Sequence, residues 1–289
     1  MSPRKRQLRF AVPKGHMFEQ VRTLLADAGL KLRVEERGYR PTASDPDLEI
    51  KLLRAQNIPQ LVHLGSMDIA FAGHDWVRES RSKVVEVLDC GLDPVSIVAA
   101  APRGQTLARL RRRKQVVAAS EYRNLTSRWL RREDISHVIV QTFGATEVFP
   151  PEDADLIVDN TATGTTLRKN HLDILATLLT SSTRFLASQR AMADRWKRKK
   201  IEDLALLLQA VLDARARSML EMNISAERLD RLVAKLPCMR SPTVAPLFGD
   251  EGFAVKVAVP RKDVAALVLR LKELGATDII ETRFEKVLP

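Results

Sequence analysis

The residue types and spacing that most directly suggest chemistry lie in segment 158–170, VDNTATGTTLRKN. An aspartate follows an apolar run, small hydroxyl residues and one glycine come next, and no Lys or Arg occurs before Arg168. Amide groups at the start of a helix attract anions, and a glycine lets the backbone approach a phosphate closely. Threonine hydroxyls can donate further hydrogen bonds to phosphate oxygens. The segment therefore suits a phosphate monoester.

The carboxylate at the entrance of this segment needs a different role. Asp159 would repel a phosphate that it touched, so it, or the nearby Asp155, would accept hydrogen bonds from sugar hydroxyls. A phosphate and a sugar diol together describe a 5-phosphoribosyl group. The expected donors are Thr163, Gly164, Thr165 and Thr166. The alternative is an ordinary strand-to-helix turn capped by threonine. Neither the P-loop pattern nor G-x-G-x-x-G occurs.

The elements that would position this loop alternate between apolar runs and amphipathic stretches over the first 185 residues. This alternation predicts an α/β fold, a mostly parallel sheet with helices on both faces, and ligands at the carboxyl ends of the strands. Strands are expected at 8–12, 48–53, 67–73, 94–102, 114–120, 137–143 and 154–159, and helices at 16–29, 58–65, 107–113 and 125–133. Small residues and turn signals suggest a crossover between two lobes near residue 95.

The pattern changes in the last hundred residues. Apolar residues at helical spacing predict one long helix over 189–219. Beyond it, a β-α-β-β-α-β order with a GDEG hairpin signal at 249–252 predicts a ferredoxin-like domain. We expect three domains: lobe I at 1–94 with a return segment at about 184–217, lobe II at 95–183, and the ferredoxin-like domain at 218–289.

Composition limits the classes of function. The 289 residues carry a formal net charge of +11, but the basic clusters are scattered and aromatic residues make up only 5%, so we expect no nucleic-acid partner. No apolar run is long enough to span a membrane, and no signal-type segment follows the basic N-terminus. Two distant cysteines disfavour a disulfide scaffold or zinc cluster. We expect a cytoplasmic protein with an anionic small substrate.

Several segments, in order, resemble those of the ATP phosphoribosyltransferase family in its long form, and they cover nearly the whole chain. They are LRFAVPKG, RAQNIPQLV, GSMDIAFAGHD, ASEYRNLTSRWL, GATEVFP, ADLIVDNTATGTTLRKN and SPTVAPL. The resemblance implies a two-lobed core like periplasmic binding proteins and a C-terminal regulatory domain. It implies transfer of the phosphoribosyl group from phosphoribosyl pyrophosphate to N1 of ATP, the first step of histidine biosynthesis. It also implies Mg²⁺, inhibition by histidine, and a homo-hexamer with dimer forms.

The same resemblance implies roles for individual residues. The phosphoribosyl phosphate loop would comprise Thr163, Gly164, Thr165, Thr166 and Leu167, with Asp159 at its head. Catalytic positions at the cleft would be Lys14, Arg54 and Glu147, and the ATP side would include Gly15, His16, Asp68 and Gly73. The alternatives are surface cations for Lys14 and Arg54 and a solvent-facing glutamate for Glu147. Asp75 matches the cleft too, or caps a helix.

Some positions depart from the family pattern. The family usually has arginine where this chain has His16, aspartate where it has Asn57, and D-L-G-I where it has DIAF at 68–71. Losing a guanidinium removes a bidentate phosphate contact that histidine cannot reproduce. The phosphoribosyl loop is unchanged. A paralogue with another acceptor therefore remains an alternative, as does a non-catalytic small-ligand sensor of the same fold.

For the last domain, the resemblance implies a histidine site. Ser241 and Thr243 match the family's histidine-binding strand, Glu221 or Asn223 would receive the amino group, and Ala276 lies on the terminal segment. Hydroxyls and one acid suit a zwitterionic amino acid. The alternative is a structural module for assembly. Because the chain carries this domain itself, we expect no separate regulatory subunit.

Overall fold

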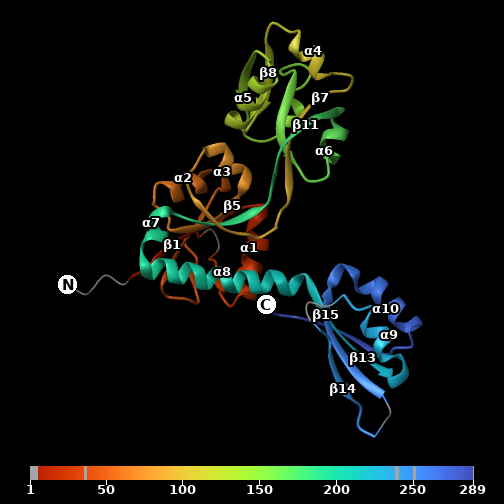
Figure 1. Ribbon diagram of the computed structural model, residues 1–289. Helices are drawn as coiled ribbons and strands as arrows, with labels where there is room; N and C mark the ends of the chain where they lie inside the picture. Colours follow the sequence, from red (N-terminus) through yellow and green to blue (C-terminus); the bar gives the residue numbers. More distant parts are fainter. Residues whose placement is uncertain (1–5, 36–37, 238–240, 250–251, 289) are drawn as a thin grey trace, which may run out of the picture. The chain divides into compact units, whose positions relative to one another are not determined.

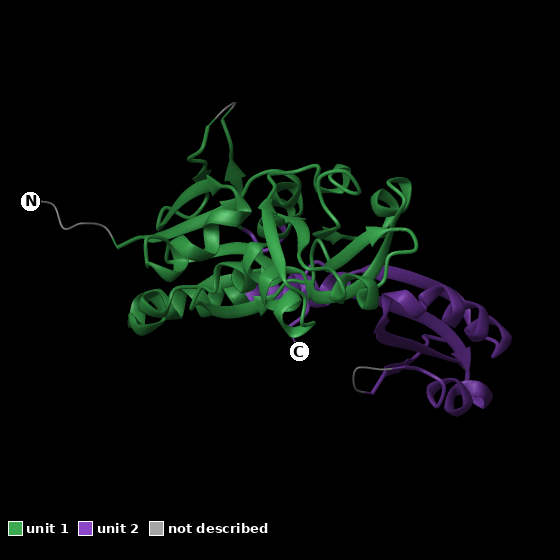
Figure 2. Ribbon diagram, turned by 90° about the horizontal axis from the view of Figure 1, so that it is seen from above, with its two compact units in different colours: residues 1–25, 30–205 green, residues 26–29, 206–289 purple. Residues whose placement is uncertain are grey.

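The computed structural model describes residues 6–35, 38–237, 241–249 and 252–288. The chain divides into two compact units, one of residues 1–25 and 30–205 and one of residues 26–29 and 206–289 (Figure 2). None of the helices in the described part is both long and apolar enough to cross a membrane.

The first sheet of the larger unit has the strand order β4-β1-β5-β12-β6. Its strands are β1 (Leu8–Pro13), β4 (Leu48–Leu53), β5 (Ile69–Gly73), β6 (Val85–Asp89) and β12 (Thr183–Ala187), and its helices are α1 (His16–Asp27), α2 (Ile58–His63) and α3 (His74–Ser80). A short pair, β2 (Leu32–Arg33) and β3 (Thr42–Ala43), precedes β4. Strand β1 runs parallel to β4 and β5, whereas β12 is antiparallel to both of its neighbours.

The second sheet has the order β11-β7-β10-β8-β9. Its strands are β7 (Val95–Pro102), β8 (Val116–Ser120), β9 (His137–Gln141), β10 (Leu156–Thr161) and β11 (Leu172–Ser181), and its helices are α4 (Leu107–Arg111), α5 (Arg123–Arg132) and α6 (Thr165–Lys169). Alternate residues of β7 and β10 enter two different apolar clusters, one with α4 and α5 and the other with α6. The prediction of helices on both faces is therefore confirmed.

The prediction of a mostly parallel arrangement is confirmed, because four of the five strands in each sheet run in the same direction, although each sheet also contains one interior antiparallel strand. Strand β7 runs antiparallel to β10 and β11, just as β12 does within the first sheet. The chain passes from the first sheet to the second between β6 and β7, and returns between β11 and β12. Two lobes joined by two crossing strands make the core fold periplasmic-binding-protein-like. Strands β6, β11 and β12 are missing from the sequence-based expectation.

The long helix predicted over 189–219 is wrong in its extent. The structure has α7 (Gln189–Ala193), α8 (Arg195–Arg215) and then strand β13 from Arg217. Asp194 takes an extended conformation with ψ 121°, and its carboxylate accepts a hydrogen bond from the Lys197 amide at 2.9 Å. A side-chain cap of this kind starts a new helix rather than continuing an old one.

The smaller unit is ferredoxin-like, as predicted. Its elements are β13 (Arg217–Ser225), α9 (Leu229–Val233), β14 (Thr243–Pro246), β15 (Gly252–Pro260), α10 (Val264–Glu273) and β16 (Thr277–Arg283), and all of them except β16 are labelled in Figure 1. The sheet order is β14-β15-β13-β16, and all neighbours are antiparallel. Two residues of the predicted hairpin, 250–251, lie outside the described residues.

The first sheet buries three phenylalanines against one another. Phe10, Phe71 and Phe185 come from three neighbouring strands, and their ring centroids lie 5.2 to 6.2 Å apart. Cys90 directly follows β6 and is buried. This burial raises the pKa of its thiol to about 12. The thiol therefore stays protonated and unreactive, and its role is to fill space in the core. Cys238 lies outside the described residues.

Candidate active site

Two cations meet because two parallel strands end side by side. Lys14 follows β1 and Arg54 follows β4, and the last residues of these strands, Pro13 and Leu53, are register partners. The Lys14 amide donates to the Leu53 carbonyl at 2.8 Å. Because the carboxyl ends of parallel strands share one edge of a sheet, both cationic side chains face the same region.

This region is a cleft of about 450 Å³ between the two sheets of the larger unit. Predicted site residues that line it are Lys14, Gly15, His16, Arg54, Gly73 and Asp75. The Lys14 ammonium lies 3.2 Å from the Tyr39 hydroxyl and 4.4 Å from its ring centre, an arrangement that positions the cation over an aromatic face. Gly15 has φ 92°, a conformation that glycine adopts without strain.

A buried hydrogen-bond network closes one side of the cleft. Asp75 is only 5% exposed, and its two carboxylate oxygens accept from the Ser181 hydroxyl at 2.6 Å and the Tyr122 hydroxyl at 2.8 Å. The Ser181 oxygen in turn accepts from the Asp75 amide at 2.9 Å. The network joins α3 of the first lobe to the start of α5 and the end of β11 in the second. Asp75 is thus a structural link at the cleft rather than a simple helix cap.

The same network explains Gly73 and orients Tyr122. A Cβ on Gly73 would overlap an Asp75 carboxylate oxygen, so the small residue leaves room for the network. The Tyr122 ring stacks on Trp76 with centroids 4.6 Å apart. Burial, followed by the Asp75 charge, raises the pKa of Tyr122 far above its usual range. The hydroxyl therefore stays protonated and donates.

Asp68 does not join the other predicted site residues. It precedes β5 and lies at the amino end of the strand, opposite to the end where Gly73 meets the cleft. Its carboxylate pairs with Arg9 at 3.1 Å and Lys197 at 2.7 Å. Burial acts to raise the pKa of Asp68, but the hydrogen bonds from Arg9 and Lys197 outweigh it and lower the pKa. Its place is an internal ion-pair cluster.

The loop predicted to bind the phosphoribosyl phosphate follows β10 and opens the five-residue helix α6. Gly164 has φ 71°, and its amide donates to the Thr161 hydroxyl at 2.9 Å. Thr163, Thr165 and Thr166 are exposed, whereas Leu167 is 4% exposed and packs into the core. The Leu167 side chain therefore anchors the loop, and only its backbone amide is suited to a phosphate. First-turn amides of this kind have no partner within the helix.

Three acids gather at the head of this loop. Asp159 lies on β10, and burial raises its pKa to about 6, helped by the charges of Glu121 and Glu147 and opposed by hydrogen bonds from the Asn160 amide and Thr146. Glu121 also lines the cleft, as does Asn160. The predicted residues Asp159 and Glu147 are thus near each other, and Glu121 connects them to the cleft. Glu147 itself does not line the cleft.

Asp155 does not fit the ribose role that was left open for it. It precedes β10, at the amino end of the strand, whereas the loop follows the carboxyl end. Its carboxylate pairs with Arg113 and accepts from the Val117 amide at 2.8 Å. Of the two aspartates, only Asp159 lies beside the loop.

Sequence reasoning missed several residues that line the cleft. They are Asp93 and Val95 before and at the start of β7, Tyr122, Asn160, and Ser181, Ser182 and Thr183 where the chain returns. Burial raises the pKa of Asp93, and the neighbouring His16 charge partly offsets it. The crossover expected near residue 95 was the available signal, because a cleft between two lobes is lined by the segments that join them.

The predicted effector residues fall into two groups. Register places Thr243, Lys256 and Glu221 in one row across three strands, and Lys256 pairs with Glu221 at 2.9 Å. Asn223, two residues along β13, donates to Asp278 at 3.0 Å. Ser241 precedes β14. Ala276 is 1% exposed and packs in the apolar core, so its side chain cannot contact a ligand at the surface.

Family comparisons agree with this layout. The ATP phosphoribosyltransferase family model matches residues 54–210, and the model of the HisG C-terminal domain matches residues 214–286. An ATP phosphoribosyltransferase of Pelotomaculum thermopropionicum is 38% identical over 288 residues, covering 98% of this chain and all of that one. The chain belongs to the ATP phosphoribosyltransferase family.

A further relative supports this membership, and a solved structure shares the fold. An ATP phosphoribosyltransferase of Prosthecochloris aestuarii is 36% identical over 293 residues and covers both chains completely. A solved chain from the ATP phosphoribosyl transferase (HisG:HisZ) complex of Thermotoga maritima superposes with a TM-score of 0.63 at 24% identity, covering 70% of this chain and 99% of that one. That chain shares the fold with this ATP phosphoribosyltransferase family member.

Proposed function

We propose that the protein transfers the 5-phosphoribosyl group of phosphoribosyl pyrophosphate to N1 of ATP and releases pyrophosphate, the first step of histidine biosynthesis. Full-length similarity to named ATP phosphoribosyltransferases is the observation that carries this proposal. The bond that forms joins adenine N1 to ribose C1, and the bond that breaks joins C1 to a pyrophosphate oxygen. Because the adenine nitrogen is itself the nucleophile, the reaction needs no catalytic triad.

The loop after β10 binds the phosphoribosyl group of the donor substrate. The backbone amides of Thr165, Thr166 and Leu167 and the threonine hydroxyls bind the 5-phosphate, and Asp159 accepts hydrogen bonds from the ribose diol. The exposure of the three threonines and the position of Asp159 directly before the loop support this assignment. Asp159 must be ionised to accept both hydrogen bonds, which sets a pH requirement on binding.

The cleft binds the leaving pyrophosphate and the acceptor nucleotide. Lys14 and Arg54 stabilise pyrophosphate and triphosphate oxygens as charge develops on the leaving group. Their shared edge of the sheet supports this role. Gly15 and His16 bound the acceptor side. Glu147 contributes its negative charge to the acidic cluster that it forms with Asp159 and Glu121. Asp68 is left out of the acceptor site because of its ion pairs.

Magnesium fits this chemistry as an ion carried by the substrates. Within the described ranges, no three His, Cys, Asp or Glu side chains are grouped to hold a metal. Mg²⁺ retains several waters and binds through substrate phosphates with few protein ligands. When bound, it would neutralise charge on the leaving pyrophosphate. The chain's own contribution is to hold two polyanionic substrates in line.

The identity of the acceptor has one competing candidate. His16 lines the cleft at a position where the family usually has arginine, so this position lacks the bidentate phosphate contact of a guanidinium, which favours another acceptor. A coupled assay separates the two: phosphoribosyl pyrophosphate, Mg²⁺ and pyrophosphatase, with ATP or with other purine nucleotides and bases. Rising absorbance of phosphoribosyl-ATP supports ATP. Pyrophosphate release only with another acceptor overturns ATP and keeps the donor.

Regulation and assembly complete the proposal. The C-terminal unit binds histidine through the row of Thr243 and Glu221, with Ser241 beside it, and this binding inhibits transfer. The protein assembles as a homo-hexamer through dimers, works in the cytoplasm, and needs no separate regulatory subunit because it carries a domain that matches the HisG C-terminal model. Histidine added to the same assay should suppress turnover. Turnover that is indifferent to histidine would remove the regulatory part alone.

A further inference from the structure

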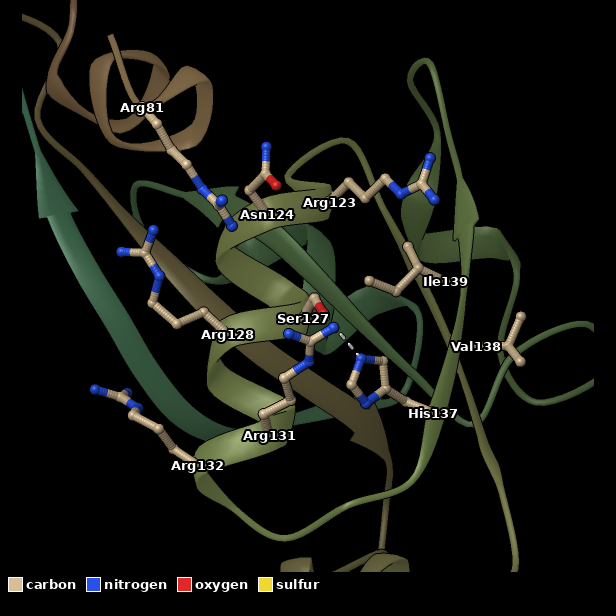
Figure 3. Close-up of a pocket in the computed structure, with 10 residues that line it drawn as sticks. All are labelled: Arg81, Arg123, Asn124, Ser127, Arg128, Arg131, Arg132, His137, Val138 and Ile139. Carbon is tan, nitrogen blue, oxygen red and sulfur yellow. Dashed lines mark hydrogen bonds between the residues drawn. The ribbon is translucent and has the colours of Figure 1, made fainter. Parts of the chain in front are cut away.

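An open cavity of about 980 Å³ lies away from the cleft, along the outer face of α5 (Figure 3). Most of its lining comes from α5, with β9 on one side and Arg81, at the end of α3, on the other. It shares no lining residue with the cleft described above. The residues that line it include five arginines, which are Arg81, Arg123, Arg128, Arg131 and Arg132.

These arginines have no ion-pair partner among the described residues. The two acids at the ends of α5 already have partners, and neither of them lines the cavity. Glu79 accepts hydrogen bonds from the Asn124 and Leu125 amides at 2.8 and 2.9 Å, and Glu133 pairs with Arg111 at 2.6 Å. The cavity therefore lacks a protein anion, and like charges so close together repel one another.

The helix holds these cations in place. Its inner face is buried through Leu125, Thr126, Trp129 and Leu130, so the arginines rise from a fixed backbone. Figure 3 shows Arg128 and Arg132 projecting to one side of the helix and Arg131 lying beside Ser127 and His137. Guanidinium groups bind phosphate oxygens in a planar, bidentate manner, and several on one rigid element suit a ligand with more than one phosphate.

The uncharged groups beside Arg131 are already paired. The His137 Nδ1 lies 2.9 Å from the Ile135 carbonyl, which can only accept, so Nδ1 carries the proton. The other ring nitrogen then accepts from the Ser127 hydroxyl at 3.1 Å. Both ring nitrogens therefore have a partner, and these contacts hold the ring in place. The arginines are thus the groups left to bind a ligand.

We propose that this arginine cavity is a second anion site, which binds a small oligophosphate of two or more linked phosphates. Its volume falls in the range of about 300 to 1,000 Å³ that is usual for small-ligand pockets. Its lining contains no Phe, Tyr or Trp, so the large base-stacking surfaces of single-strand nucleic-acid sites are missing from it. The four arginines of α5 span about 13 Å of helix, which suits a compact ligand. The inference goes beyond the proposed transferase reaction and does not depend on it.

The test is calorimetric titration of the full-length protein with inorganic tripolyphosphate at fixed ionic strength. Because the cleft also carries cations, the starting protein is the Lys14→Gln/Arg54→Gln variant. This variant should retain a tripolyphosphate site whose Kd equals the Kd of the same site in the unsubstituted protein. Adding Arg128→Gln and Arg131→Gln should raise that Kd at least tenfold. Adding Arg112→Gln and Lys114→Gln instead, which removes the same charge from an exposed segment outside the cavity, should change it less than twofold.

Other outcomes overturn the proposal. Equal losses from the cavity pair and the control pair would show an effect of net charge alone. Orthophosphate binding as tightly as tripolyphosphate would contradict a site for linked phosphates. An RNA oligonucleotide binding more than tenfold tighter than tripolyphosphate, with the same loss in the cavity variant, would assign the face to nucleic acid. Circular dichroism checks folding, which should be unaffected because the substituted arginines are exposed.

Discussion

At the scale of single residues, the site depends on the environment as much as on residue type. Asp68 precedes β5 and Asp159 lies on β10. Hydrogen bonds from Arg9 and Lys197 lower the pKa of Asp68, whereas burial and neighbouring acids raise the pKa of Asp159. The difference places the first in an ion-pair cluster and leaves the second available for its proposed role at the ribose. Gly164 acts through the backbone rather than through a charge, because its φ of 71° and its lack of a side chain shape the loop.

Substituting Gly164 tests the loop directly. Gly164→Asp adds a carboxylate where the 5-phosphate is proposed to bind, and its Cβ would lie 3.1 Å from an Arg168 nitrogen. We expect kcat/KM for phosphoribosyl pyrophosphate to fall at least 100-fold, measured in the coupled pyrophosphatase assay. Gly249→Asp is the matched control, since Gly249 has φ 69° and open space around it. Unchanged kinetics in Gly164→Asp would remove the loop from the site.

Asp159 predicts opposite effects on activity and stability. Its folded pKa of about 6 lies above the unfolded value of about 3.9, so the folded state loses stability as pH rises between these values and remains penalised above them. Asp159→Asn should therefore stabilise the protein by up to about 3 kcal/mol above pH 6, at about 1.4 kcal/mol per pKa unit, and by nothing below about pH 4. Thermal melts across pH measure this.

The same variant should lose activity. If the Asp159 carboxylate binds the ribose diol, wild-type kcat/KM rises with pH through about 6, and Asp159→Asn is at least tenfold slower with that rise removed. Glu152→Gln, an exposed acid on the same lobe, serves as the control. A wild-type pH profile retained in Asp159→Asn would mean that another group causes the rise.

At the scale of elements, strand ends and crossings create the cleft. Parallel pairing of β1 with β4 brings Lys14 beside Arg54, and the antiparallel strands β7 and β12 bring the crossing segments to the same place. The Asp75 network then fastens the start of α3 to α5 and β11. Packing at this junction should be sensitive to a single methyl group.

A double-mutant cycle measures that sensitivity. Gly73→Ala places a Cβ against the Asp75 carboxylate and should destabilise the protein by about 1 to 3 kcal/mol, the usual cost of overpacking. Its φ of −66° is acceptable for alanine, so the cost is steric. In the Asp75→Ala background the same change should cost less than about 0.5 kcal/mol, because the clash is gone. Urea denaturation gives both values, and equal costs would contradict the steric explanation.

At the scale of the whole molecule, catalysis and control are assigned to separate compact units. The larger unit holds the cleft, the loop and the arginine cavity, and the smaller one holds the row of Thr243, Lys256 and Glu221. Inhibition by histidine should therefore be separable from transfer by substitutions in the smaller unit.

Thr243→Ala tests this separation. It removes a hydroxyl from the proposed effector row without touching the cleft, so we expect the histidine concentration for half-inhibition to rise at least tenfold while kcat/KM changes less than twofold. Thr282→Ala, an exposed threonine on β16 of the same unit, should leave inhibition unchanged. Equal loss of catalysis and inhibition in Thr243→Ala would argue against an allosteric role.

The sequence by itself determined the features that are local in the chain. Hydrophobic alternation located β1, β4, β5, β7, β8, β9 and β10, the β-α-β-β-α-β order predicted the last domain, and one threonine- and glycine-rich segment indicated the phosphoribosyl loop. Local periodicity and turn chemistry carry this information, since both depend only on neighbouring residues. The same segments were enough to indicate the family.

Only the tertiary structure decided which distant residues meet. It separated Asp68 and Asp155 from the site by placing them at the amino ends of their strands, and it brought Asp93, Tyr122 and Ser181 to the cleft. It also showed that the arginines of α5 share a cavity with Arg81. Strand direction, register and the hydrogen bonds of buried acids depend on the packed sheets. No single segment of the sequence contains them.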